Sequence, residues 1–414
     1  MCKNNKISTL KYYIYTLFVQ MRLIRIVNIL YLIQVVGISL LQYTLLQSIF
    51  SISQFLMEIP SGILGDSFKK KTITIVGVLL LIISPLIICS NFFMNSNISF
   101  YILGIAFVIE GIGRAFISGA DDALFFEKIR DDGYADDYDK IRGKCQLISS
   151  ISVGVATLLG TCLYSFNARL PYIGQSLALL CTIPIILSIN ENKVINPHTS
   201  KDEKPNSLKN MVLSISTIKN SPQILFMAFF IIVTFAIINT VFGIIPNYMS
   251  EIGFTSVENG TVFMILSLIG GLVATQSYRF SNWSHGKLIL LTSSMMAGSL
   301  LFVVFNNKVL TCIGFVLLYI IIDVLDPIAM KAFNIWVKDN IRATFLSLIS
   351  FAISAMTMLL YPITGIIVQT YGMFVLLSII DFGTIIMLVI LYFLFTFYER
   401  NRKRVGKNGS ATTN

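Results

Sequence analysis

The chain has 414 residues, of which 55% are hydrophobic and 13% are charged, and its mean hydropathy is +0.78. Soluble domains carry about 25% charged residues, so the composition excludes a water-soluble globular protein, a disordered chain, a disulfide scaffold and a soluble nucleic-acid-binding domain. The net charge of +10 comes from 31 Lys and Arg against 21 Asp and Glu.

Apolar stretches long enough to cross a membrane recur along the whole chain. A helix needs about 20 apolar residues to cross about 30 Å of hydrocarbon. Twelve such stretches are predicted, at residues 11–34, 40–64, 72–92, 98–120, 145–166, 170–190, 222–248, 258–278, 288–305, 309–330, 343–367 and 372–397. The chain is therefore predicted to be an all-α membrane protein with twelve transmembrane helices.

The positions of the cations predict the orientation of these helices. If the N-terminus is cytoplasmic, 26 of the 31 Lys and Arg residues fall in cytoplasmic segments, two (Arg169 and Lys308) fall on the outer side, and three lie within spans. Lys and Arg are enriched in the cytoplasmic segments of membrane proteins. Both termini are therefore predicted to be cytoplasmic, with the basic tail at 399–414 beside anionic lipid.

The first span carries two charges near its middle. Arg22 and Arg25 lie about one helical turn apart, and Asn28 follows one turn later. An ionisable group inside a span costs about 2.5–3.5 kcal/mol on insertion scales, which makes it a functional hypothesis by default. The two arginines either bind an anionic group of a substrate or neutralise Glu58 and Glu110. In a further interpretation, the span begins later and both side chains extend towards the cytoplasm.

A short basic loop separates the second and third spans. The segment GILGDSFKKKTIT, Gly62–Thr74, places Asp66 at a helix end, before three lysines. A carboxylate at that position can accept hydrogen bonds from a neighbouring helix N-terminus or pair with a cation. The loop is interpreted as a latch on the cytoplasmic face that opens during transport, or as charge that only sets the topology.

The fourth span contains an acid and a base on one face. Glu110 and Arg114 lie four residues apart and can pair, while Gly111 and Gly113 allow close approach of a neighbouring helix. In the functional interpretation, Glu110 exchanges its arginine partner for a proton when substrate arrives. In the structural one, the pair is a permanent buried salt bridge.

Two further acids, Asp121 and Asp122, lie where the fourth span ends. They are interpreted as part of a solvated face paired with nearby basic residues. The alternative is a gate that pairs with Arg342 or with the lysine loop.

The longest polar stretch divides the chain in the middle. Residues 190–221 contain the segment NENKVINPHTSKDEKPNS, which has two prolines and little to bury, so it is predicted to be a cytoplasmic linker. Six spans precede it, in an N-terminal half at 1–189, and six follow, in a C-terminal half at 222–398. This layout is typical of the repeats of secondary transporters, whose substrate site lies near the midplane of the membrane.

The tenth span contains two carboxylates. Asp323 and Asp326 lie three residues apart, directly before Pro327. Two neighbouring buried carboxylates repel each other as anions, which suits a proton carrier. The alternative is that both bond to backbone groups freed at Pro327. Asp381, in the last span, is a weaker candidate because that helix is expected at the periphery.

Several of these segments resemble the major facilitator superfamily of transporters. Its cytoplasmic loop motif, Gly-x-Leu-Ala-Asp-Arg-x-Gly-Arg-Lys, is similar to the second loop of this chain at Gly62, Leu64, Asp66, Lys70 and Lys71, whereas Ser67 and Lys69 depart from it. The segments EIPSG (Glu58–Gly62), SGADDAL (Ser118–Leu124), RATFLSL (Arg342–Leu348) and YPITG (Tyr361–Gly365) resemble a bacterial branch that exports drugs and small molecules. The second copy of the loop, RFSNWSHGK (Arg279–Lys287), lacks the aspartate. The fifth span lacks the Gly-Pro pair of many drug/proton exporters.

The resemblance implies a secondary active transporter in a bacterial plasma membrane that works by alternating access. The predicted function is proton-coupled efflux of a drug, antibiotic or metabolite. The predicted coupling and substrate cavity contains Arg22, Arg25, Glu58, Glu110, Arg114, Asp323 and Asp326, and the predicted gate contains Gly62, Leu64, Asp66, Lys70, Lys71 and Arg342. Alternatives are proton-coupled uptake or exchange of an anionic metabolite, favoured by the arginines, and a membrane scaffold or receptor that transports nothing.

The sequence contains no pattern typical of an enzyme. It has no HExxH or GxSxG motif, no Walker loop and no histidine inside a span. Its six cysteines are scattered and read as small apolar residues. The expected partners are a small-molecule substrate and the lipid bilayer, without nucleic acid. The chain is expected to act as a monomer, with no metal and no cofactor, and with the proton gradient as its energy source.

Overall fold

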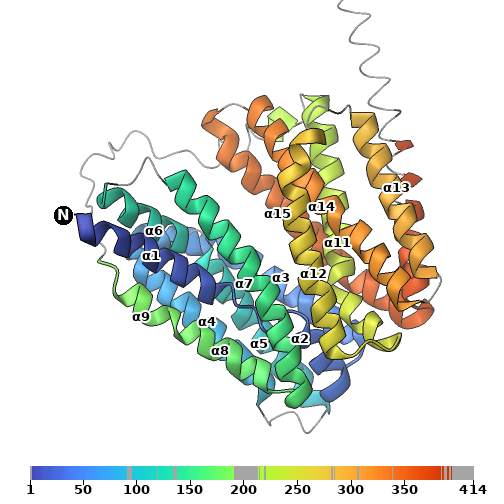
Figure 1. The fold of residues 1–414 in the computed structure, drawn as a ribbon, viewed down its shortest axis with the longest axis horizontal. Helices are drawn as coiled ribbons and strands as arrows, with labels where there is room; N and C mark the ends of the chain where they lie inside the picture. The colour runs from blue at the N-terminus through green and yellow to red at the C-terminus, as the bar shows by residue number, and fades with distance from the viewer. Residues whose placement is uncertain are drawn as a thin grey trace, which may run out of the picture. The chain divides into compact units, whose positions relative to one another are not determined.

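The structure, a computed structural model, describes the chain from residue 2 to residue 393. Excepted are residues 91–95, 119, 134–137, 191–212, 214, 219–220, 281–282, 284, 305–306, 338, 384, 387–388 and 391–392. The described part is almost entirely helical (Figure 1). Its helices are α1 (Cys2–Val19), α2 (Val27–Leu30), η1 (Tyr31–Val35), α3 (Leu40–Ser67), α4 (Lys70–Cys89), α5 (Ser96–Ile117), α6 (Ala120–Asp131), α7 (Tyr138–Phe166), α8 (Leu170–Leu180), α9 (Thr182–Leu187), α11 (Pro222–Glu251), α12 (Ser256–Gln276), η3 (Ser277–Phe280), α13 (His285–Val304), α14 (Lys308–Trp336) and α15 (Asp339–Tyr371). A shorter apolar helix follows at Met373–Gly383.

Within the described residues, eight helical segments are long and apolar enough to cross a membrane. They are Lys70–Cys89, Phe100–Asp131, Ile141–Phe166, Leu170–Leu187, Pro222–Glu251, Ser256–Val273, Lys308–Phe333 and Phe345–Tyr371. The protein is therefore a helical membrane protein. Large apolar side chains such as Leu56, Tyr101 and Phe166 are exposed on its helices, as expected for surfaces that face lipid.

The first predicted span is interrupted. The prediction of one continuous helix over residues 11–34 is wrong, because α1 ends at Val19 and α2 begins only at Val27. The next turn, η1, is a π-helix, a geometry that occurs mostly as single turns and often at functional sites. The break has a tertiary cause: the backbone carbonyl of Leu23 packs directly against Gly160 of α7, where any side chain would collide with it.

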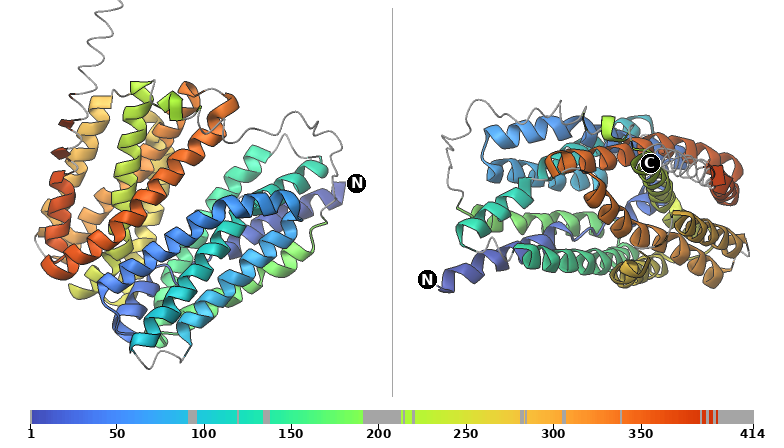
Figure 2. Two further views of the ribbon diagram at one scale, coloured as in Figure 1. Left: turned by 180° about the vertical axis from the view of Figure 1, so that it is seen from behind. Right: turned by 90° about the horizontal axis from the view of Figure 1, so that it is seen from above.

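The chain forms two compact units. Unit 1 comprises residues 1–196, 242–269 and 361–369, and unit 2 comprises residues 197–241, 270–360 and 370–414. In unit 1, α5 packs against α3 and α4, and α4 also packs against α8 (Figure 2). In unit 2, α14 packs against α13 and η3.

Glycines set the spacing of the helices around α5, as the sequence predicts. A Cβ atom on Gly111 would lie 2.6 Å from the backbone oxygen of Phe50 in α3. One on Gly113 would lie 3.0 Å from the backbone oxygen of Gly77 in α4. The prediction that Gly111 and Gly113 permit close helix packing is therefore confirmed, and it brings Glu110 and Arg114 close to both neighbours.

Candidate functional site

A polar cavity of about 300 Å³ lies in unit 1. Its walls come from α2, α3, α4, α5, α8 and the segment that joins α1 to α2, together with Tyr361 of α15. Its charged lining residues are Arg22, Arg25, Glu110 and Arg114. We call this space the Glu110 cavity. It brings together four of the residues predicted to form the coupling and substrate cavity.

The interrupted first span places two of these arginines. The backbone turns tightly here: the N–H of Arg22 donates to the carbonyl of Gln20 at 2.8 Å, and the N–H of Arg25 donates to that of Arg22 at 3.2 Å. Leu23, between them, is buried. One turn further on, the Tyr172 hydroxyl donates to Oδ1 of Asn28 at 2.9 Å. These hydrogen bonds and the buried Leu23 therefore fix the positions of Arg22, Arg25 and Asn28.

The Glu110 cavity carries an excess of positive charge. Three guanidinium groups face one carboxylate, and Arg22 is an electrostatic neighbour of Arg25, Arg114 and Glu110. In the part of the chain that the structure describes, none of these four side chains forms an ion pair within 4.0 Å or a hydrogen bond. The Nε atom of Arg22 is buried without a partner. The direct Glu110–Arg114 contact that their spacing permits is thus not formed.

A second cavity, of about 320 Å³, lies next along the same helices. We call it the Asp121 cavity. Arg22 and Arg114 line both cavities. The Asp121 cavity otherwise takes its lining from α1, from α7, from the junction of α5 and α6, and from Gln54 of α3. The two arginines therefore mark the boundary between two polar spaces.

Three segments pass from the lining of one cavity to the lining of the other, α3 and α5 in one chain direction and the first span in the opposite one. On α3, Tyr43 and Gln47 line the Glu110 cavity and Gln54 lines the Asp121 cavity. On α5, Glu110 lines the Glu110 cavity, Arg114 lines both cavities, and Ile117 lines the Asp121 cavity. On the first span, residues from Tyr12 to Gln20 line the Asp121 cavity, Arg22 lines both, and residues from Ile24 to Asn28 line the Glu110 cavity. The two cavities are thus consecutive along the helix axes.

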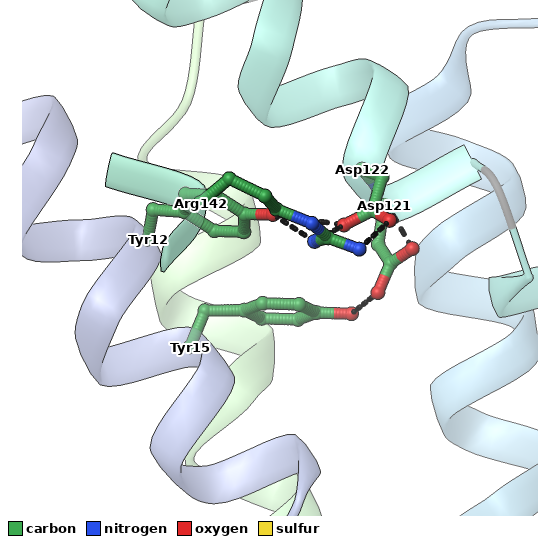
Figure 3. Close-up of polar contacts among 5 residues, drawn as sticks. All are labelled: Tyr12, Tyr15, Asp121, Asp122 and Arg142. Carbon is green, nitrogen blue, oxygen red and sulfur yellow. Dashed lines mark hydrogen bonds and ion pairs between the residues drawn. The ribbon is translucent and has the colours of Figure 1, made fainter. Parts of the chain in front are cut away.

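A hydrogen-bonded network fixes the acidic wall of the Asp121 cavity (Figure 3). Arg142 of α7 forms a two-pronged ion pair with Asp122, with 2.7 Å between Nη2 and Oδ2. Its Nη1 also donates to the Tyr12 hydroxyl at 2.6 Å, which in turn donates to Asp122 Oδ1 at 2.8 Å. The Tyr15 hydroxyl donates to Asp121 Oδ2 at 3.1 Å, and the backbone N–H of Asp122 donates to Oδ1 of Asp121 at 2.7 Å. The network ties α1, α6 and α7 together.

The basic loop between α3 and α4 makes contacts within unit 1. Lys70 forms an ion pair with Glu127 of α6. Lys71 donates to the carbonyls of Leu187 at 2.5 Å and Ile189 at 3.0 Å, which satisfies the C-terminus of α9. Gly62 and Leu64 lie in α3, which runs on to Ser67. The side chains of Asp66 and Arg342 lie outside the described part of the structure.

The remaining predicted carboxylates lie elsewhere. Glu58 is exposed on α3 and is absent from the described linings of both cavities. In unit 2, Oδ2 of Asp323 is buried without a hydrogen-bond partner, directly against Gly270 of α12. Asp326 lies one turn along α14 and is partly buried. Asp381 is buried on the helix Met373–Gly383.

Sequence reasoning missed several polar residues of these cavities. Tyr12, Tyr15, Gln175 and Arg142 line one cavity or the other. Tyrosine and glutamine are ordinary in membrane helices, so their type gives no signal. The spacing does give one for Tyr12 and Tyr15, which lie nearly one turn apart on the same side of α1.

Comparisons with known proteins agree with this architecture. The family model of the Major Facilitator Superfamily matches residues 14–322. Three similar solved structures are the nucleoside transporter NupG, the D-xylose-proton symporter and a POT family transporter in complex with 5-aminolevulinic acid. NupG is 13% identical with a TM-score of 0.77, over 94% of this chain and 99% of NupG. The symporter is 13% identical with a TM-score of 0.64, over 93% and 96% of the two chains, and the POT transporter is 12% identical with a TM-score of 0.67, over 93% and 94%. No curated protein sequence matches the chain significantly.

Proposed function

Because the chain belongs to the major facilitator superfamily, we propose that it is a secondary active transporter that moves a small organic molecule by alternating access. The observation that carries this proposal is the Glu110 cavity, a polar space with four charged residues among membrane helices. Charged groups inside membrane spans mark substrate and ion pathways. The similar structures, of a nucleoside transporter and a D-xylose-proton symporter, belong to proteins that handle small polar molecules.

The proposed topology has twelve transmembrane helices in two halves, at 1–189 and 222–398. A cytoplasmic linker at 190–221 joins them, and a basic cytoplasmic tail follows at 399–414. The distribution of Lys and Arg supports cytoplasmic termini. We place the protein in a bacterial plasma membrane as a functional monomer.

We further propose that transport is outward and coupled to protons. Glu110 is the first candidate proton carrier because it is the one carboxylate among the described lining residues of the cavity, and a substrate that takes over its arginine neighbours would favour its protonation. Asp323 is the second, with Asp326 beside it, because a buried carboxylate oxygen without a partner can take up a proton. Gly62, Leu64, Asp66, Lys70, Lys71 and Arg342 form the proposed cytoplasmic gate.

A second candidate function is proton-coupled uptake or exchange of an anionic metabolite. The excess of arginine in the Glu110 cavity favours it. The two candidates differ in direction, so accumulation assays distinguish them: export lowers the amount of substrate retained by cells, and uptake raises it.

The test begins with a resistance and accumulation screen of cells with and without the protein, each with and without an uncoupler. The compound that responds is then followed in membrane vesicles under an imposed pH gradient. We expect Glu110→Gln to express normally and to abolish gradient-driven transport. Glu58→Gln, an equal change at an exposed position on α3, serves as the control and should transport normally. Normal gradient-driven transport by Glu110→Gln would remove Glu110 from the coupling mechanism.

A further inference from the structure

We propose that the Glu110 and Asp121 cavities are two consecutive binding sites for one substrate, a small organic oxyanion with a carboxylate or phosphate group, and that Arg22 and Arg114 hold it in both. This inference rests on the proposed transport function and names the class of its substrate. It holds for either direction of transport.

The charges of the Glu110 cavity indicate the anion. Arg22, Arg25 and Arg114 outnumber the single carboxylate by two, and no described contact pairs any of them. Arg22 and Arg114 are partly buried and are electrostatic neighbours, and like charges repel each other more strongly where less water screens them. An oxyanion relieves that repulsion, and the guanidinium fork matches the two oxygens of a carboxylate or phosphate.

Two buried atoms indicate further features of the ligand. Nε of Arg22 is a donor without a partner, and Oε1 of Gln175 is an acceptor without a partner. Both residues line the Glu110 cavity. Buried polar atoms in native proteins are nearly always hydrogen-bonded. A ligand that accepts a hydrogen bond from Nε of Arg22 and donates a hydroxyl or amino hydrogen to Oε1 of Gln175 gives both atoms a partner.

The Asp121 cavity offers a second position to the same anion. Its own cation, Arg142, is already paired with Asp122 and bonded to Tyr12. The second acid of this cavity, Asp121, accepts from the Tyr15 hydroxyl and from the backbone N–H of Asp122, so three cations face two carboxylates. The cations left for a ligand are therefore Arg22 and Arg114, the two that this cavity shares with the Glu110 cavity. A substrate can thus pass from one cavity to the other while it keeps contact with a guanidinium group.

The two cavities offer matched variants for a test. Gln47 lines only the Glu110 cavity, and Gln146 lines only the Asp121 cavity. Gln47→Glu and Gln146→Glu each place a negative charge in one cavity with almost no change in shape. Arg22→Gln and Arg114→Gln remove the charge common to both, and either one tests the proposal if the other fails to fold.

The experiment measures binding to the purified full-length protein. The probes are radiolabelled succinate and glycerol 3-phosphate, with glycerol as the neutral control and choline as the cationic one. Equilibrium dialysis gives the number bound per chain, and the shift in Tm checks specificity. We expect two molecules of one anion per wild-type chain, one per chain in each glutamate variant, and at least tenfold weaker binding in the arginine variants. Whether succinate or glycerol 3-phosphate binds distinguishes the carboxylate from the phosphate.

Several results would overturn the inference. These are one anion per wild-type chain, no binding of either anion, equal binding of glycerol or choline, or an arginine variant that loses a single site. Transport of a neutral compound in the vesicle assay would also overturn it and would leave the transporter proposal standing. Binding of two anions by a protein that transports nothing would instead refute the transporter proposal.

Discussion

Some polar side chains of unit 1 can be recognised as functional candidates from the sequence, and others cannot. A charge within a membrane span is rare and costly, so Arg22, Arg25, Glu110 and Arg114 stand out in the sequence, and the structure gathers all four around one cavity. Tyr12 carries no such signal, because its role depends on Asp122 and Arg142, which lie more than 100 residues away. Long-range partners of this kind cannot be read from local pattern.

The hydroxyl of Tyr12 is predicted to stabilise the network around Asp122. Tyr12→Phe removes one hydrogen bond to Asp122 and one from Arg142. Hydrogen bonds contribute about 0.5–1.5 kcal/mol each, and the ion pair here is nearly half exposed, so we expect a loss of about 1 kcal/mol. Thermal unfolding of the purified protein measures it as a lower Tm. Tyr13→Phe is the control, because the Tyr13 hydroxyl forms no hydrogen bond among the described residues, and an equal Tm for both variants would contradict the prediction.

Individual helices were predictable in position and less so in continuity. Hydropathy located α3, α4, α7 and α14 to within a few residues at most ends, because a long apolar run in a membrane has helix as its natural conformation. The break between α1 and α2 cannot be predicted from hydropathy. No Gly or Pro lies between Val19 and Val27, so the interruption comes from packing against α7.

Gly160 is predicted to hold that break in place. In Gly160→Ala the new methyl group would collide with the backbone carbonyl of Leu23, and backbone cannot move aside cheaply. We expect the segment with Arg22 to shift, with a loss of about 1–3 kcal/mol in stability and a severalfold loss in transport. Tm and vesicle transport measure the two effects.

The matched control for that change is Gly154→Ala on the same helix. The nearest atom to its Cβ, Cγ of Met264, is at an ordinary contact distance of 3.7 Å. It should leave transport unchanged. If both alanine variants behave alike, the close approach of Leu23 to Gly160 does not position the arginines.

A second packing prediction concerns α3 and α5. Gly111→Ala places a methyl group 2.6 Å from the backbone oxygen of Phe50 and 2.8 Å from Cβ of Ser53. The helices must separate, and we expect a cost of about 1–3 kcal/mol, measured as a lower Tm. Gly104→Ala on the same helix meets no atom within 4 Å and should raise stability by up to about 1 kcal/mol. A stable Gly111→Ala variant would show that α3 and α5 can separate without penalty.

For the molecule as a whole, sequence predicted the family and the helical membrane fold, because both depend on patterns repeated many times along the chain. It did not predict that residues 242–269 and 361–369 join the compact unit of the N-terminal helices. That grouping depends on pairs such as Gly365 with Thr44 and Gly260 with Thr161. A glycine in the sequence indicates a close contact between helices only once the residue that packs against it is known.

The proposed topology predicts the side of the membrane for every loop. Fluorescent protein fused after Asn414 or after Asn190 should fluoresce, and alkaline phosphatase fused at the same points should be inactive, because both ends of an even set of spans face the cytoplasm. Phosphatase fused after Arg169 or Lys308, the two cations assigned to the outside, should be active. The opposite pattern at Asn414 would exclude twelve spans with a cytoplasmic N-terminus.

The interrupted first span also has a consequence for how the protein is made. A nascent segment with two arginines near its centre enters the bilayer poorly by itself, since each costs about 2.5–3.5 kcal/mol at the centre of a helix. Its acidic neighbour, Glu110, is translated some 85 residues after Arg25, and Gly160, which receives the Leu23 carbonyl, is translated 137 residues after Leu23. Stable integration of the first span therefore awaits synthesis of α5 and α7. Chains truncated before and after these helices, followed by glycosylation mapping of the N-terminal segment, should show the first span become fixed only in the longer ones.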